Sequence, residues 1–311
     1  MPKALVLSGG GSKGSRQVGA CEHLIAEKGH WFDVISGVSV GALNGATLAH
    51  GHDPEGLRTH LERLRAWWFG VRGNHNIYRR RRHGALGLAL GKWRGLYDVT
   101  PLREEVLRRE IDPPQVAASP TRLRVGYVDL RSGRYRTAGN DHPRLRDALL
   151  ASSSPPLLFP PTALPEGREL GVDGGMRHVA LLADALQTLA QFPLDSEPPE
   201  VWMVLLQTPR KAAPTATVRK WLRKALASLS LRDVAAPGEE GRGVRARFSI
   251  LGRRTTNEKH RCVRLRVLHP VRELAGSFLH FDPANIRAWY EDGLHTARCA
   301  QAADLVGLNG D

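Results

Sequence analysis

Strand-like and helix-like patterns of apolar residues alternate along the first fifty residues. A buried-strand pattern over 3–7 runs into the glycine loop 8–14, and a second short strand pattern over 31–37 leads into a small-residue helix over 40–51. Between them, residues 15–29 place apolar side chains on one face of a helix that ends at Gly29. Strands that alternate with helices in this way predict an α/β fold with a mostly parallel sheet.

Later segments continue the pattern to residue 305. Helices are predicted over 54–70, 100–110, 143–154, 217–231 and 282–305. Strands are predicted over 200–208 and 261–270, and a hairpin over 122–139. We expect Thr100 to be the N-cap of its helix and residues 71–95 to be irregular. The length suits one large domain, assigned to 1–311, with a core over about 3–208 and a C-terminal part over about 209–305.

The composition is that of a globular protein with a strongly basic surface. Of the 311 residues, 41% are apolar and 24% are charged, and the formal net charge is +14. Arginines are densest over 78–84 and 242–267. A basic surface attracts polyanions such as nucleic acid, anionic lipid headgroups or an acidic protein.

The cysteines and the apolar runs exclude several classes of protein. Cys21, Cys262 and Cys299 have no CxxC spacing, so they predict neither a disulfide framework nor a zinc site, and we expect each to be a small buried side chain. The N-terminus lacks the apolar region of a signal peptide, and no apolar run approaches the ~18 residues that span a bilayer. We therefore expect a cytoplasmic protein.

The glycine loop S-G-G-G-S-K-G (8–14) follows a strand and opens a helix. Such loops present unpaired backbone N–H groups and bind anions. One use is the pyrophosphate of a dinucleotide, which Gly9, Gly11 and Gly14 would hold while Asp33 contacts the ribose. Another use is an oxyanion hole. A P-loop NTPase is disfavoured because G-x-x-x-x-G-K-[ST] is absent.

A G-x-S-x-G pattern, from Gly37 to Gly41, follows the second strand and precedes a helix. A sharp turn at this point lifts the hydroxyl of Ser39 clear of the backbone, as in a nucleophile elbow. Neighbouring parallel strands would bring this turn and the glycine loop to the same edge of the sheet. The alternative is a glycine-rich turn without chemistry.

Asp173 ends a predicted short strand in L-G-V-D-G-G (170–175) and is the candidate base for Ser39. A lone Asp-Gly-Gly is otherwise typical of a turn. His178, His269 and His280 follow in the order of an α/β-hydrolase triad. Too few strands precede Ser39 for that fold, so we interpret these histidines as surface or core residues.

Together the three motifs resemble those of the patatin-like phospholipase family. The family's three glycines followed by x-[RK]-G appear over 9–14, its elbow over 37–41 and its D-G-[GA] over 173–175. Softer similarities lie in 95–104, 149–161 and the C-terminal segments 267–270 and 281–293. The resemblance covers about residues 3–298 and implies a three-layer α/β/α fold with a mostly parallel central sheet.

The resemblance also implies a mechanism. Ser39 would attack an acyl ester, and Asp173 would accept its proton and later activate water. The oxyanion hole would be formed at Gly9, Gly10, Gly11 and Ser12, and the motifs would be supported by Lys13, Gly14, Gly37, Gly41, Gly174 and Gly175. The implied substrate is a phospholipid or lysophospholipid, with no metal and no cofactor. Lys13 replaces the commoner arginine, which keeps the charge but loses the guanidinium fork.

One departure concerns the segment after Asp173. The family usually carries an Asn and then a Pro there, whereas this chain has His178 and Leu181. The local shape behind Asp173 is therefore expected to differ.

Two other functions stay open at the level of sequence. One is a dinucleotide-binding oxidoreductase, which nicotinamide binding would reveal. The other is a basic nucleic-acid or regulatory binding protein without activity, which salt-sensitive DNA retention would support. The leading interpretation, an acyl hydrolase, expects a phospholipid substrate, no nucleic acid, and peripheral contact with anionic membrane through the basic face and the helices 54–70 and 217–231.

Overall fold

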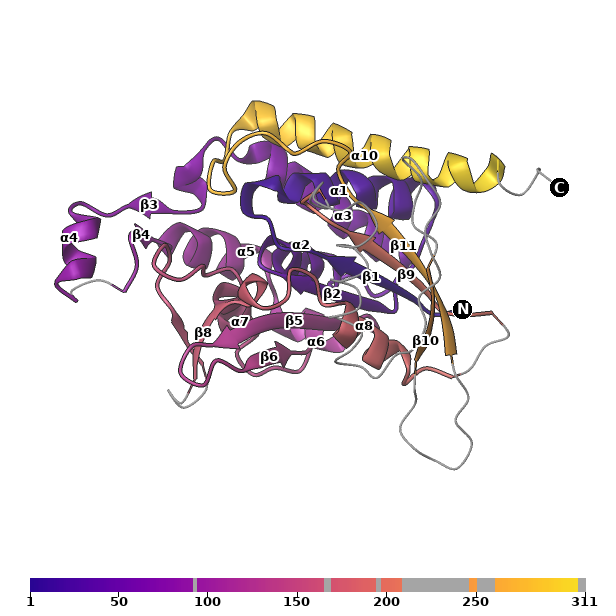
Figure 1. Ribbon diagram of the computed structural model, residues 1–311, viewed down its shortest axis with the longest axis horizontal. Coiled ribbons are helices and arrows are strands. Elements are labelled where there is room, and N and C mark those ends of the chain that lie inside the picture. Colours follow the sequence, from indigo (N-terminus) through magenta and orange to yellow (C-terminus); the bar gives the residue numbers. More distant parts are fainter. Residues whose placement is uncertain (92–93, 165–168, 194–196, 209–245, 251–260, 307–311) are drawn as a thin grey trace.

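A central β-sheet organises the chain (Figure 1). The computed structural model describes residues 1–91, 94–164, 169–193, 197–208, 246–250 and 261–306. Within these residues the sheet has nine strands in the order β10-β11-β9-β1-β2-β5-β8-β7, with β6 paired to β5. The strands are β1 (Lys3–Leu7), β2 (Val34–Val38), β5 (Arg122–Asp129), β6 (Tyr135–Ala138), β7 (Thr162–Ala163), β8 (Leu170–Asp173), β9 (Glu200–Val204), β10 (Ala246–Ile250) and β11 (Arg261–Leu268).

The centre of the sheet is parallel, as the sequence predicts. Strands β11, β9, β1, β2 and β5 run in one direction, with Ala4 of β1 opposite Val34 of β2. The strands β10, β6, β8 and β7 add antiparallel pairs outside this centre. Parallel strands are usually covered on both faces, which explains why β1 and β2 are buried along almost their whole length.

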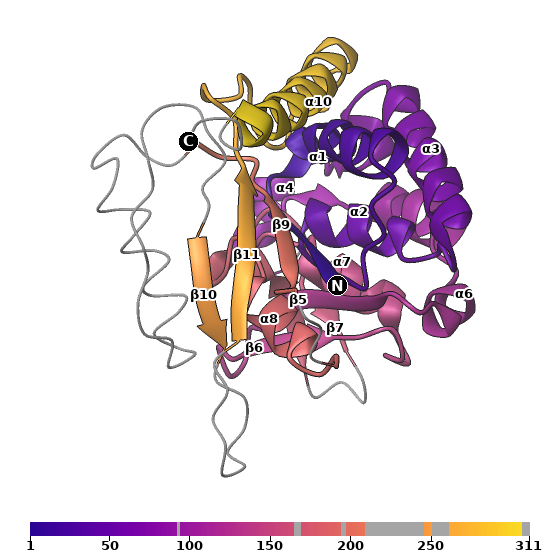
Figure 2. The same cartoon turned by 90° about the vertical axis from the view of Figure 1, so that its right-hand side faces the viewer.

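Helices cover both faces of the sheet, and Figure 2 shows α1, α2 and α3 gathered on one of them. Successive residues of a strand point to opposite faces. Leu5 and Leu7 of β1 accordingly pack into a larger core with these helices, while Ala4 and Val6 pack with α8. This arrangement confirms the expected three-layer α/β/α fold. Among the described residues, the helices of eight or more residues, together with α1, are α1 (Ser15–Cys21), α2 (Val40–Leu48), α3 (Pro54–Gly70), α7 (Leu145–Ser152), α8 (Leu182–Leu189) and α10 (Pro283–Val306).

Most predicted elements are confirmed. The hairpin over 122–139 is β5 and β6, and the helix over 282–305 is α10. The predicted apolar face of α3 is buried in the larger core, which removes that face from contact with a membrane. The helix over 217–231 lies outside the described residues. That all 311 residues form a single domain stays a prediction.

Three local predictions are wrong. Thr100 precedes its helix at the predicted N-cap position, but its side chain does not cap the helix, because its hydroxyl donates to Asp98 at 2.9 Å instead. Residues 71–95 contain short regular elements, among them β3 (Arg79–Arg80) and α4 (Gly84–Ala89). Cys21 is buried, but Cys299 is exposed, because the end of α10 carries it to the surface. The side chain of Cys262 lies outside the described residues.

Helix α10 packs closely on α1. A Cβ on Gly19 would come within 1.9 Å of the carbonyl oxygen of Tyr290, so only glycine permits this approach. The guanidinium of Arg16 is fully buried at the same contact and donates to Asp292 at 2.6 Å and Thr296 at 3.0 Å. These interactions tie the C-terminal helix to the helix that follows the glycine loop.

None of the helices in the described part of the chain combines the length and apolarity that crossing a membrane requires.

Candidate active site

Ser39 occupies a strained turn between β2 and α2. Its φ and ψ are 55° and −127°, a conformation that non-glycine residues rarely adopt and that costs on the order of 1–3 kcal/mol. The flanking glycines permit the turn, since a Cβ on Gly37 would come within 2.3 Å of the oxygen of Gly41, and a Cβ on Gly41 within 2.4 Å of the oxygen of Leu7. The G-x-S-x-G pattern therefore forms the sharp strand-to-helix elbow that the sequence predicts.

Asp173 ends β8 and lies beside this elbow. Strand β8 pairs with β5 in antiparallel register, with Asp173 opposite Tyr127. Ser39 and Asp173 line the same pocket, and the hydroxyl of Ser39 lies near enough to the carboxylate of Asp173 to lower its pKa. Burial raises the pKa of Asp173 to about 6, although the hydrogen bonds from Gly175 and Ser39 to the carboxylate act in the opposite direction. The carboxyl group therefore changes charge close to neutral pH.

The end of α7 and the residues that follow it hold both residues in place. The hydroxyl of Ser152 accepts a hydrogen bond from the amide of Ser39 at 2.9 Å and donates one to the carbonyl of Gly126 at 2.7 Å. Two residues later, the carbonyl of Ser154 accepts a hydrogen bond from the amide of Asp173 at 2.9 Å. Residues 152–154 thus connect the elbow, β5 and β8.

The glycine loop borders the elbow. A Cβ on Gly9 would lie 3.4 Å from the Cβ of Ser39. The amide of Gly9 donates to Val179 and the amide of Ser12 donates to Phe278 at 2.8 Å, so both are occupied. Within the described residues the amides of Gly10 and Gly11 have no hydrogen-bond partner. Of the four residues expected to form an oxyanion hole, Gly10 and Gly11 offer free amides, and Gly9 and Ser12 do not.

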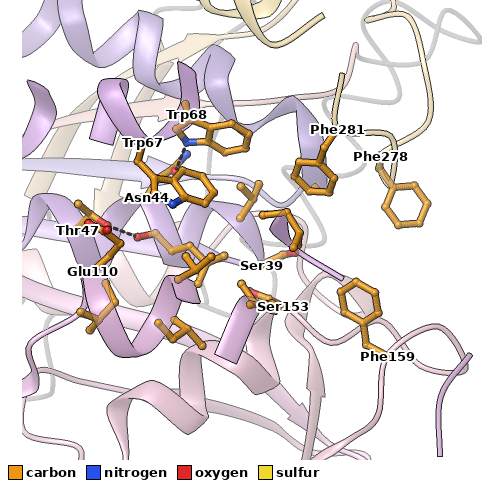
Figure 3. A pocket seen from close by; sticks show the side chains of 18 of the residues that line it. Ser39, Asn44, Thr47, Trp67, Trp68, Glu110, Ser153, Phe159, Phe278 and Phe281 are labelled. Atoms are coloured by element: carbon orange, nitrogen blue, oxygen red, sulfur yellow. Dashed lines mark hydrogen bonds between the residues drawn. The ribbon is translucent and has the colours of Figure 1, made fainter. Parts of the chain in front are cut away.

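A largely apolar pocket of about 840 Å³, part of it open to solvent, contains Ser39 and Asp173 (Figure 3). Figure 3 shows Ser39 and Ser153 midway along it, with Phe159 and Phe278 to one side and Glu110 to the other. Apolar side chains form most of its wall: Val40, Leu43, Leu64, Trp67, Trp68, Ile77, Leu102, Val106, Leu107, Ile111, Pro155, Phe159, Phe278, Leu279 and Phe281. A pocket with walls of this chemistry suits a long apolar group.

Two polar residues of the pocket, Asn44 and Ser153, differ in their hydrogen bonds. Asn44 donates to Gly14 and Gln17 and accepts from the indole of Trp68 at 3.0 Å, so its hydrogen bonds are internal. The hydroxyl of Ser153 is buried and has no partner within the described residues. An unpartnered buried hydroxyl is uncommon, and this one is free to meet a bound molecule.

Comparison with known proteins identifies the family. The sequence model of the patatin-like phospholipase family matches residues 5–186, more than half of the chain. The chain belongs to the patatin-like phospholipase family. Membership indicates a lipid-ester hydrolase. No curated protein sequence matches the chain.

Several solved structures are similar to this patatin-like chain over nearly its whole length. VipD from Legionella pneumophila is 14% identical with a TM-score of 0.47, covering 97% of this chain and 67% of its own. Human GIVD cytosolic phospholipase A2, in complex with methyl gamma-linolenyl fluorophosphonate, is 11% identical to this chain with a TM-score of 0.47. The match covers 99% of this chain and 59% of the phospholipase chain. ExoU of the ExoU-SpcU complex from Pseudomonas aeruginosa is 13% identical with a TM-score of 0.36, and the match covers 98% of this chain and 51% of ExoU. The chain spans about half to two thirds of the length of these proteins.

The other residues of the patatin-like motifs lie around this site. Lys13 donates to the carbonyl of Leu274 at 2.9 Å, so it ties the glycine loop to the segment that precedes α10. Gly14 packs against Val40 and Trp68, and Gly174 against β5. Gly175 donates its amide to Asp173 at 2.7 Å.

The departure from the family pattern leaves Asp173 in contact with Ser39. His178 is exposed, and its ring meets that of Tyr135 edge-on at 4.7 Å. Leu181 is buried, and its carbonyl accepts a hydrogen bond from Ser36. The pocket wall includes none of His178, His269 and His280, in agreement with their interpretation as surface or core residues.

Asp33 contradicts the dinucleotide alternative. Its carboxylate accepts a hydrogen bond from the amide of Lys3 at 2.8 Å, at the amino ends of β1 and β2. The glycine loop follows the carboxyl end of β1, one strand length away, or roughly 17 Å. Asp33 therefore cannot contact a ribose whose pyrophosphate lies on that loop. In the described part of the chain, no three His, Cys, Asp or Glu side chains group closely enough to hold a metal ion.

Two kinds of residue at the site give no clear signal in the sequence. Ser152 and Ser153 lie in the stretch 149–161 that resembles the family, but no role follows from their spacing. Phe278 contacts the glycine loop from a segment more than 260 positions away, through the hydrogen bond from Ser12. No local pattern predicts such a contact. The three successive serines before two prolines are a signal for polar residues that line a pocket.

Proposed function

We propose that this protein is a serine acyl hydrolase that cleaves acyl esters of phospholipids or lysophospholipids. The observation that carries the proposal is that Ser39 and Asp173 line one apolar pocket, with Ser39 near enough to Asp173 to influence the pKa of its carboxyl group. A hydroxyl next to a carboxylate that titrates near neutral pH is a suitable nucleophile and base pair. The strained backbone of Ser39 supports the same role, because strain clusters at functional sites.

The reaction proceeds in two halves. The oxygen of Ser39 attacks the ester carbonyl carbon while its proton moves to Asp173. Collapse of the tetrahedral intermediate breaks the ester bond, and the leaving alcohol takes the proton from Asp173. Asp173 then removes a proton from water, which attacks the acyl-serine, and the proton returns to the Ser39 oxygen as the fatty acid leaves.

Gly10 and Gly11 are the proposed donors to the oxyanion. Their amides are unpaired, and the neighbouring Gly9 borders Ser39. Preorganised amides stabilise negative charge that develops on the carbonyl oxygen in the transition state. Ser12 has no part in this proposal, because its amide is held by Phe278.

The apolar wall selects an acyl chain as the bound group. Burial of methylene groups against side chains such as Trp67 and Leu107 stabilises the complex by roughly 0.8 kcal/mol for each CH₂. A carboxylic ester with a long chain therefore fits better than a short polar ester. The proposed mechanism uses no cofactor and no metal.

Fatty-acid release from phosphatidylcholine and lysophosphatidylcholine tests this function. Wild-type protein should release fatty acid from one or both, and Ser39→Ala should reduce the rate by at least about 10³-fold. Ser132→Ala, which changes an exposed serine in the turn between β5 and β6, is the matched control and should retain activity. Wild-type protein that releases no fatty acid from either lipid would refute the proposal.

A further inference from the structure

A short protrusion extends from the body of the protein on the left of Figure 1. It consists of β3, α4 and β4 (Tyr97–Asp98), and β3 pairs with β4 at its base, with Arg80 opposite Tyr97. We refer to the described residues of 79–98 as the protrusion. Its outer part is α4, which Figure 1 shows away from the helices that cover the sheet.

The protrusion exposes apolar side chains. Leu86 in α4 is 59% exposed, and Leu90, which directly follows α4, is 73% exposed. The amide of Leu90 donates to the carbonyl of Leu86 at 2.9 Å, so the two residues lie one helical turn apart. Leu157, which is 67% exposed, lies next to the base, where its carbonyl accepts a hydrogen bond from Leu96 at 2.9 Å. Single exposed leucines are ordinary, whereas apolar side chains that gather on the surface are a feature of interaction sites.

Cationic side chains accompany these leucines. Arg79, Arg80 and Arg82 are all exposed. Arg79 lies 3.7 Å from Glu105, whereas Arg80 and Arg82 have no acidic partner among the described residues. Exposed leucines beside unpaired arginines are typical of surfaces that contact anionic lipid, because the apolar groups enter the interface and the cations meet headgroups.

The base of the protrusion packs against residues that line the pocket. The ring of Tyr78, directly before β3, lies 4.7 Å from that of Tyr97 and 5.6 Å from that of Phe159. The hydroxyl of Tyr78 also donates to the carbonyl of Leu279 at 2.6 Å. Phe159 and Leu279 both line the pocket that contains Ser39. A surface that binds the protrusion is therefore held close to the pocket.

We propose that the protrusion docks this protein on anionic phospholipid bilayers. Leu86 and Leu90 enter the interface, and Arg80 and Arg82 contact anionic headgroups. Docking brings the pocket rim, where Phe278 is 45% exposed, toward the lipid. This inference rests on the proposed function for the reason why the pocket should face lipid, but docking itself needs no catalysis.

Sedimentation with vesicles tests the docking. Wild-type protein should bind vesicles of phosphatidylcholine and phosphatidylserine more tightly than phosphatidylcholine alone, and added salt should weaken this binding. The double variant Arg80→Ser and Arg82→Ser should bind the anionic vesicles about 30-fold more weakly. The double variant Leu86→Ser and Leu90→Ser should weaken binding by at least about tenfold on the same vesicles.

Matched control variants remove the same kind of side chain from another part of the surface. They show whether weaker binding is specific to the protrusion or follows from any loss of charge or apolar surface. The pair Arg58→Ser and Arg63→Ser removes two exposed arginines from α3, and Leu130→Ser removes an exposed leucine from the turn between β5 and β6. Both controls should bind vesicles as wild type does. Equal binding by the protrusion variants and wild type would overturn the proposal, and this is also the outcome if the protrusion binds a protein.

Two further measurements keep this proposal distinct from the proposed function. Ser39→Ala should bind vesicles as wild type does. The protrusion variants should hydrolyse a soluble short-chain ester at the wild-type rate, which also shows that they fold. Vesicle binding without ester hydrolysis by wild type would refute the enzyme and leave docking intact, whereas hydrolysis without vesicle binding would refute docking alone.

Discussion

The backbone amide of Ser39 donates a hydrogen bond to the hydroxyl of Ser152 at 2.9 Å. That hydroxyl is fully buried and donates in turn to the carbonyl of Gly126, so it fixes the elbow against β5. Ser152 is therefore a positioning residue for the proposed nucleophile. Its position behind the elbow keeps it out of the pocket wall.

Ser152→Ala should lower kcat for a soluble ester by about 10- to 100-fold, because the elbow amide loses a buried partner. KM and the pH at which activity is lost should stay unchanged, since Ser152 contacts neither substrate nor Asp173. Ser154→Ala is the matched control, because it removes a buried hydroxyl that bonds only the carbonyl of Leu150. Steady-state kinetics that show an equal loss in both variants would argue against positioning by Ser152.

The raised pKa of Asp173, about 6, predicts an acid limb in the activity. The ionised carboxylate is the base, so kcat/KM should fall as the pH drops through about 6 and stay flat above it. A pH profile of ester hydrolysis measures this directly. A limb near the ordinary aspartate pKa of about 4 would mean that Asp173 is not desolvated in the free enzyme.

The raised pKa of Asp173 also makes the free energy of unfolding depend on pH, in the opposite direction to the activity. An Asp whose folded pKa is raised stabilises the fold most below its unfolded pKa of about 4, and this contribution is lost as the pH rises through about 6. Asp173→Asn should therefore increase the free energy of unfolding by about 2 kcal/mol at pH 8 and by little at pH 4. Urea unfolding at both pH values gives the comparison, and a variant less stable than wild type at pH 8 would contradict it.

Alanine in the glycine loop should impair catalysis. A Cβ on Gly11, whose φ is +58°, would come within 2.1 Å of the oxygen of Phe278, and one on Gly10 within 2.6 Å of Leu206. Either change displaces the free amides, so kcat for a soluble ester should fall by about 10²–10³-fold. Gly70→Ala, with no atom near the added Cβ, is the control that should retain activity. Unimpaired turnover by both loop variants would remove Gly10 and Gly11 as oxyanion donors.

The contact between α1 and α10 predicts a large effect on stability away from the site. Gly19→Ala places a Cβ within 1.9 Å of the carbonyl of Tyr290, a backbone atom that cannot move without shifting α10. The free energy of unfolding should fall by about 3 kcal/mol, measured by urea unfolding. A loss below about 0.5 kcal/mol would mean that the two helices separate readily.

Local patterns predicted the parts of the fold that depend on local chemistry. The spacing of Leu57, Leu61 and Leu64 predicted α3 because a helix needs one apolar face, and the glycines around Ser39 predicted the elbow because only glycine permits so close an approach. The meeting of Ser39 and Asp173 depended on the resemblance to a family. Periodicity alone does not say that β8 pairs with β5.

Contacts between distant segments account for what the sequence did not predict. The hydrogen bond from the amide of Ser12, a predicted oxyanion donor, to the carbonyl of Phe278 is one such contact. The cap at Thr100 failed because the carboxylate of Asp98 competes for the hydroxyl. The exposure of Leu86 and Leu90 follows from the projection of α4, which arginines and glycines in the sequence did not reveal.

Labelling with a fluorophosphonate tests the central claim most directly, because the reagent forms a covalent bond with an activated serine. Intact-mass measurement of wild-type protein should show one adduct, and peptide mapping should place it on Ser39. Ser39→Ala should take up no label, and Asp173→Asn should react far more slowly because the base is lost. A label on another residue, or labelling of Ser39→Ala at the wild-type rate, would contradict the assignment of Ser39 as the nucleophile.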